Sequence, residues 1–164
     1  MIYIENKYDN PIDIDFEDIA INVINASIDY VKCPFDCEVN LLITNNDEVK
    51  KLNSENRDID SPTDVLSFPA IHFEKPCEFS KIEDDSFNFN PESGELVLGD
   101  IVISYDKVIE QAKEYGHTTV REFAFLIAHS MLHLFGFDHI NEEERKLMET
   151  EQESILNMLN YRRD

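Results

Sequence analysis

Three of the five histidines in the chain lie close together, in the segment HSMLHLFGFDH over residues 129–139. His129 and His133 are four residues apart, so on one helix their side chains project from the same face, about 6 Å apart. A third ligand requires the chain to break and return, and Gly136 offers that break because glycine adopts a left-handed φ at little cost. His139 then falls in the turn beyond. Three imidazoles and a water form the open tetrahedral arrangement of a catalytic zinc, so the spacing predicts one Zn²⁺ ion.

The same histidine spacing occurs in metal-dependent proteases, which carry a glutamate as general base directly after the first histidine. Here that position is Ser130. This argues against a peptidase and leaves a metalloprotease-like hydrolase of another kind open. Glu122 lies two turns earlier on the same predicted helix, where a role in capping is the simpler interpretation. Asp138 is either an acceptor behind a metal ligand or a plain turn residue.

A second group of candidate residues lies in the segment LNSENRDIDSPTDVLSFP, over residues 52–69. Arg57 is one of few cations in the middle of the chain. On composition alone, a surface cation paired with Asp58 or Asp60 is the simpler interpretation. Pro62 and Thr63 predict an extended start to the strand that follows.

The elements that must position these residues follow from the spacing of apolar side chains. We expect strands at residues 2–4, 38–44, 63–68 and 96–103. Four helices are expected to begin after typical N-cap residues, namely Asp15, Thr44, Ser104 and Asn141. A further helix is expected to open with a capping box of Thr119 and Glu122, to carry the first two histidines and to end at Gly136.

The order of these elements is typical of an α+β fold, with a small mixed sheet of about four strands and helices packed on it. The chain has 164 residues, which is the length of a single domain over 1–164. Residues 70–95 form an irregular region that is longer than loops usually are inside a compact domain, so we expect a mobile flap or insertion there.

Charge and composition restrict the class of protein further. The formal net charge is −21, which argues against loose, sequence-blind nucleic-acid binding, because that needs a basic face. There is no apolar segment of the ~18 residues that a membrane helix needs and no signal-peptide pattern at the N-terminus, so we expect a cytoplasmic protein. Cys33 and Cys37 form a lone C-x3-C pair without a second ligand pair, and idle thiols are the simpler interpretation.

Taken together, the two motif groups resemble the YbeY family of bacterial endoribonucleases. The resemblance rests on Leu52, Asn53 and Arg57, on PTDVLSFP over residues 62–69, on LGDIVI over residues 98–103, and on the histidine segment. The chain departs from the family pattern at Ser130, where glycine is usual, and at Phe137, where tyrosine is usual. Both departures leave the three histidines intact. The 70–95 region also looks longer than in many members.

The resemblance implies a zincin-like domain with a metal-binding helix and turn. It implies a zinc-dependent, single-strand-specific endoribonuclease in 3′-end maturation of small-subunit (16S) ribosomal RNA, ribosome biogenesis and ribosome quality control. His129, His133 and His139 are the expected metal ligands, with His133 and Arg57 as catalytic residues and Arg57 also binding substrate. The implied partners are ribosomal RNA, the small ribosomal subunit with one of its proteins, and an assembly GTPase. We expect a monomer and no membrane partner.

Two mechanisms and one further function stay open at this point. Zn²⁺ lowers the pKa of its water toward ~7, which supplies a nucleophile without a carboxylate base. Alternatively, the RNA 2′-OH attacks and leaves a 2′,3′-cyclic phosphate. A non-catalytic, zinc-containing ribosome assembly factor is the further function. The acidity predicts weak binding of free RNA, through the metal, Arg57 and local cations such as Lys50, Lys51 or Arg121.

Overall fold

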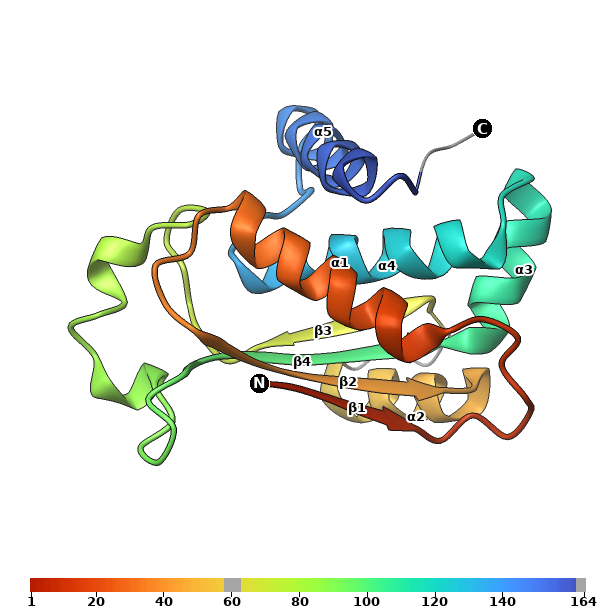
Figure 1. Cartoon of the computed structure of the whole chain (residues 1–164), viewed down its shortest axis with the longest axis horizontal. Helices are drawn as coiled ribbons and strands as arrows, with labels where there is room; N and C mark the ends of the chain where they lie inside the picture. Colours follow the sequence, from red (N-terminus) through yellow and green to blue (C-terminus); the bar gives the residue numbers. More distant parts are fainter. Residues whose placement is uncertain (58–62, 162–164) are drawn as a thin grey trace.

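The computed structural model describes residues 1–57 and 63–161 and contains a four-stranded sheet of order β1-β2-β4-β3 (Figure 1). The strands are β1 (Ile2–Asn6), β2 (Cys37–Thr44), β3 (Val65–Pro69) and β4 (Leu96–Ser104). β1 and β4 both pair with β2 in parallel, whereas β3 pairs with β4 antiparallel. The predicted mixed sheet of four strands is therefore confirmed.

The described residues also form five α-helices, which pack around this sheet: α1 (Phe16–Tyr30), α2 (Asn46–Arg57), α3 (Tyr105–Tyr115), α4 (Thr119–Leu134) and α5 (Glu142–Met158). Figure 1 shows α1 and α4 above the sheet, α2 below it, and α5 lying over α1 and α4. The predicted α+β fold is confirmed. Within the ranges described above, no helix is long and apolar enough to cross a membrane.

Helix α4 lies at the centre of the packing, between the sheet and α5. Eleven of its 16 residues are buried. This explains why its sequence is apolar on nearly every face rather than along one stripe. The helix that carries the first two histidines is thus held on several sides, and its C-terminal end is placed rigidly.

Two predicted helix caps are wrong by one residue. Thr118 caps α4, because its hydroxyl accepts from the N–H of Arg121. The predicted capping box at Thr119 therefore does not form, although the sequence there matches the capping-box pattern. Asn45 caps α2, because its side-chain oxygen accepts from the N–H of Glu48, which moves that cap one residue past Thr44. The α4 cap therefore lies one residue before the predicted position and the α2 cap one residue after it, because two adjacent residues can each accept the bond.

The remaining three predicted caps occupy the N-cap positions. Ser104 accepts from the N–H of Lys107, and Asn141 accepts from the N–H of Glu144, as an N-cap side chain does. Asp15 precedes α1, but its side chain makes no capping hydrogen bond.

The irregular 70–95 region contains two short 3₁₀ turns, Phe79–Lys81 and Ser86–Asn88. Its first half is anchored in the core rather than loose. Phe73 is buried and makes an edge-to-face contact with Phe79, and both rings lie against Phe135 just beyond α4. The N–H of Cys77 donates to the carbonyl of Phe135 at 3.0 Å. This segment therefore supports the turn that follows α4.

Candidate metal centre

The three predicted ligands come together at the C-terminal end of α4. His129 and His133 project from the helix, and their Nε2 atoms lie 3.1 Å apart. His139 returns from the turn beyond, so that one ring nitrogen of each histidine lies within 4.8 Å of the others. The convergence predicted from spacing is present, and the donor set is the one that open zinc sites use.

Gly136 makes the chain return. Its φ is +97°, which an L-residue adopts only under strain. Past this residue, the N–H of Phe137 donates back to the carbonyl of Leu132 at 3.0 Å and closes the helix end. A Cβ at Gly136 would also lie 2.7 Å from the Cβ of Phe73. Both the backbone conformation and the close approach of Phe73 therefore require glycine here.

The same turn fixes the ring of His133. Nδ1 of His133 lies 2.9 Å from the carbonyl oxygen of Phe137, which can only accept, so Nδ1 carries the proton. Nε2 is then left unprotonated and faces His129. A backbone carbonyl behind one ring nitrogen and an unprotonated second nitrogen form the usual arrangement of a metal-ligating histidine. The residues present therefore fit a divalent metal ion.

Burial keeps His129 neutral. Its pKa is lowered from 6.5 to about 4, first because the ring is removed from water and then because His133 lies beside it. A metal ligand must be the neutral imidazole, so this ring is available as a ligand at neutral pH. Behind it, Nδ1 lies 2.9 Å from the Nε2 atom of Gln152 on α5.

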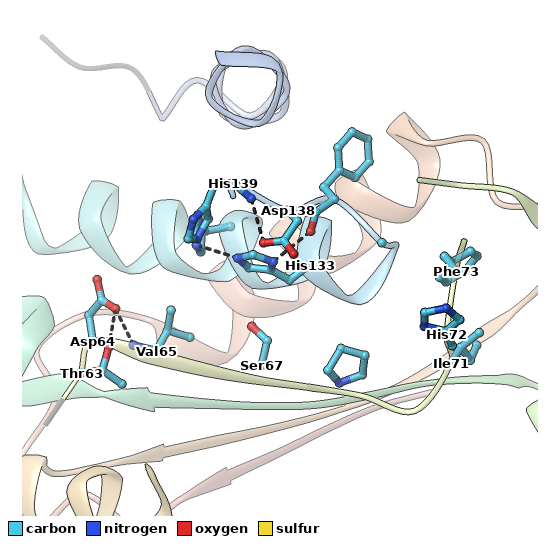
Figure 2. Close-up of a pocket in the computed structure, with 14 residues that line it drawn as sticks. Thr63, Asp64, Val65, Ser67, Ile71, His72, Phe73, His133, Asp138 and His139 are labelled. Carbon is cyan, nitrogen blue, oxygen red and sulfur yellow. Dashed lines mark hydrogen bonds between the residues drawn. The ribbon is translucent and has the colours of Figure 1, made fainter. Parts of the chain in front are cut away.

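The three rings line a cleft of about 620 Å³ (Figure 2). One wall comes from β3 and the residue before it, where Asp64 and Ser67 face the cleft, and the other end is closed by residues 71–73. Asp138 accepts from the N–H of His139 at 2.8 Å. This contact supports its interpretation as a turn residue.

Ser130, at the position of the protease glutamate, does not face the cleft. It is fully buried, and its hydroxyl is hydrogen-bonded to that of Ser67 on β3. The Ser130 hydroxyl is therefore held against β3 and provides no carboxylate base for a substrate in the cleft. The position of Ser130 strengthens the case against a peptidase mechanism.

Glu122 also lies outside the cleft and makes no capping box. It is only 3% exposed. Burial, followed by the nearby carboxylate of Asp64, raises the pKa of Glu122 from 4.5 to about 7. Asp64 therefore lies between the cleft and the buried carboxyl group of Glu122.

We expect the variant Glu122→Gln to flatten the pH dependence of stability. In the wild type, the folded state binds this proton more tightly than the unfolded state, so the stabilisation is complete below pH 4.5 and is lost as the pH rises to about 7. Urea unfolding of both metal-free proteins at about pH 5 and about pH 8 measures how much the free energy of unfolding changes between the two pH values. His129 acts in the opposite sense but is common to both proteins. Equal pH dependence in the two proteins would contradict the raised pKa.

Two predicted cation contacts have different outcomes. Arg57 is the last residue of α2, and its side chain lies outside the described part of the chain, so its phosphate contact stays a prediction. Pro62 of the family motif also lies outside the described residues.

Arg121 is 4% exposed, and its guanidinium donates to the carboxylate of Glu153 at 2.8 Å and the carbonyl of Tyr161 at 2.7 Å. It holds α5 against α4 and is buried from RNA, which overturns its predicted contact.

Two site residues were not predicted from the sequence, Ser67 and Gln152. Ser67 lies within the PTDVLSFP motif, but only strand pairing shows which face of β3 carries it. Gln152 occupies the buried stripe of α5, together with Met148, Ile155 and Leu156. A polar residue in phase with that apolar stripe was the available signal.

The fold is a small mixed sheet packed on a buried helix, and the site has two histidines one turn apart and a third after a glycine turn. The class of protein is therefore an α+β domain with a three-histidine group that can hold a metal ion. The family model described as "Endoribonuclease YbeY" matches residues 3–160. The chain belongs to this family, as its motifs predict.

Individual relatives cover the whole chain. The protein named endoribonuclease YbeY from Lachnoclostridium phytofermentans is 50% identical over 163 residues, which are 99% of each chain. The protein of the same name from Lachnospira eligens is 47% identical, also over 99% of each chain. The solution structure of TM1509 from Thermotoga maritima has a TM-score of 0.57 and 25% identity, and the match covers 98% of this chain and 92% of that one. The predicted family of enzymes is confirmed.

Proposed function

We propose that this chain is a zinc-dependent, single-strand-specific endoribonuclease that acts in 3′-end maturation of 16S ribosomal RNA. The observation that carries the proposal is the convergence of three ligand nitrogens within 4.8 Å in a cleft of about 620 Å³. Relatives at about half identity over the full chain are named endoribonucleases. His139 and Asp138 are exposed at the rim, so an RNA chain can reach the ligands from the surface.

The chain's own residues prepare the site for this chemistry. When bound, Zn²⁺ supplies a Lewis acid and lowers the pKa of a coordinated water toward about 7. His129 and His133 would hold the ion as neutral imidazoles, and the Phe137 carbonyl keeps the His133 ring in the required tautomer. Arg57 contacts the scissile phosphate, where a guanidinium binds two oxygens and the charge that develops on them.

The proposal extends to the setting of the reaction. The enzyme works in the cytoplasm as a monomeric single domain, in ribosome biogenesis and quality control. Its partners are the small ribosomal subunit, one of its proteins and an assembly GTPase. The net charge of −21 supports this setting, because a strongly acidic enzyme gains little from long-range attraction to RNA and needs protein partners for affinity.

We expect Arg57→Ala to slow cleavage of single-stranded RNA about 100-fold, the usual loss for one donor to a developing anion. Arg57→Lys should recover part of the rate, since a lysine supplies charge without the planar fork. The control is Arg145→Ala, an exposed arginine on α5 that pairs with Glu142. Cleavage kinetics with measured metal content test this prediction. An unchanged rate in Arg57→Ala would show that Arg57 does not contact the scissile phosphate.

The ends of the RNA products distinguish the two chemical routes. Attack by a water activated at the metal leaves no cyclic phosphate. Attack by the RNA 2′-OH leaves a 2′,3′-cyclic phosphate, and mass spectrometry of the fragments would detect it. A matched duplex of the same sequence tests strand specificity, since the proposal predicts cleavage of the single strand alone.

A further inference from the structure

Gln152 is a buried polar residue whose side chain reaches a metal ligand. It lies on α5, is 2% exposed, and occupies the same stripe as Met148, Ile155 and Leu156. Burying an amide costs free energy unless the amide is hydrogen-bonded. The contact that satisfies it is with Nδ1 of His129, at 2.9 Å.

The two nitrogens of His129 have different surroundings. Nε2 lies 3.1 Å from Nε2 of His133, at the point where the three rings converge. Nε2 is therefore the ligand atom. A neutral imidazole that gives its Nε2 lone pair to a metal carries its proton on Nδ1, and that N–H then needs an acceptor.

Gln152 supplies this acceptor by a rotation of its amide. The oxygen and nitrogen of a carboxamide occupy nearly the same volume, so either can face Nδ1 without a change in packing. With Oε1 toward the ring, Gln152 accepts from Nδ1–H and keeps Nε2 pointed at the metal. Gln152 thus does for His129 what the Phe137 carbonyl does for His133.

Helix α5 is anchored next to this contact. Glu153, the adjacent residue, accepts from the guanidinium of the buried Arg121 at 2.8 Å, and Arg121 also donates to the carbonyl of Tyr161. Both ends of this clamp connect α5 and the residues after it to α4. Figure 1 shows α5 above α1 and α4 and nearly end-on, so that it crosses over α4. The clamp thus holds α5, which carries Gln152, against the helix that carries His129.

We propose that Gln152 is a positioning residue that orients His129 for metal binding and so ties α5 to the metal centre. The inference rests on the proposed metal site. Loss of an acceptor behind a ligating histidine typically weakens metal binding ~10–100-fold.

The test compares Zn²⁺ affinity, by competition with a chromophoric chelator, in the wild type, Gln152→Met and Gln152→Glu. Methionine keeps the length and fills the space without an acceptor, so affinity should fall at least ~10-fold. Glutamate keeps an acceptor and should restore affinity to within a few-fold of the wild type. The control is Gln111→Met on α3, whose amide donates to the carboxylate of Asp64 at 3.4 Å.

A merely structural role gives a different result. In that case Gln152→Met lowers the melting temperature of the metal-stripped protein and leaves Zn²⁺ affinity unchanged, which overturns the inference. If Gln152→Met does not fold, Gln152→Leu replaces it as the apolar variant, and its Zn²⁺ affinity is compared with that of Gln152→Glu. If the wild type binds no Zn²⁺, the proposed metal site itself is wrong. If the wild type binds Zn²⁺ and the apolar variants bind it with equal affinity, only the proposed role of Gln152 is wrong.

Discussion

The variant His133→Ala is expected to lose its metal ion and to cleave single-stranded RNA at least ~1,000-fold more slowly than the wild type. His133 is the middle ligand of the set, with Nε2 3.1 Å from that of His129 and its ring 5.1 Å from that of His139. Two remaining imidazoles bind a divalent ion far more weakly than three. The side chain faces the cleft and is only partly buried, so its removal should leave the fold intact.

A matched histidine in the same cleft provides the control for this variant. His72 lines the cleft but is not part of the converging group. His72→Ala should therefore keep one metal ion per chain, as measured by elemental analysis. If His133→Ala retained a full equivalent of metal and the wild-type rate, the three-histidine centre would not be the site of cleavage.

The second large effect is expected from Gly136→Ala, which should lower the free energy of unfolding by about 2–5 kcal/mol. An L-residue at φ +97° is strained, and its Cβ would lie 2.7 Å from the Cβ of Phe73. Phe73 cannot withdraw easily, because it is packed between Phe79 and Phe135. Displacing the turn also moves His139 and the Phe137 carbonyl, so Zn²⁺ affinity should fall with stability.

Gly94→Ala separates backbone strain from steric overlap. Gly94 also has a positive φ, +76°, but a Cβ there meets nothing within 4 Å. It should cost about 1 kcal/mol and leave the metal site unaffected. Denaturant unfolding of both variants measures the difference. Equal costs would mean that Phe73 moves away freely and that the close approach at Gly136 has no structural role.

The local parts of the site were predictable from the sequence, because they depend on spacing along one segment. Two histidines one turn apart, a glycine three residues after the second, and a third histidine beyond it determine the turn before any tertiary contact is known. The four strands were predictable for a similar reason, since their apolar alternation is local. The helix caps were less so, because Thr118 and Thr119 are adjacent and both suit an N-cap.

Contacts between distant segments were not predictable in this way. Gln152 and His129 are 23 residues apart, and only the docking of α5 on α4 brings them together. Arg121 looked like an available cation, yet it is buried and its partners lie on α5 and beyond. An arginine near the start of a helix indicates a buried clamp only when its acidic partner is known. The Ser67–Ser130 pair depends in the same way on how β3 meets α4.

The most direct test of the central claim is cleavage of a single-stranded RNA oligonucleotide by the wild-type protein before and after removal of its metal with a chelator. We expect no cleavage by the stripped protein, and full activity after one equivalent of Zn²⁺ per chain is returned. His133→Ala should stay inactive at that concentration. Undiminished cleavage by protein whose metal content has been reduced to a trace would show that the three-histidine centre does not need a metal ion to cleave RNA.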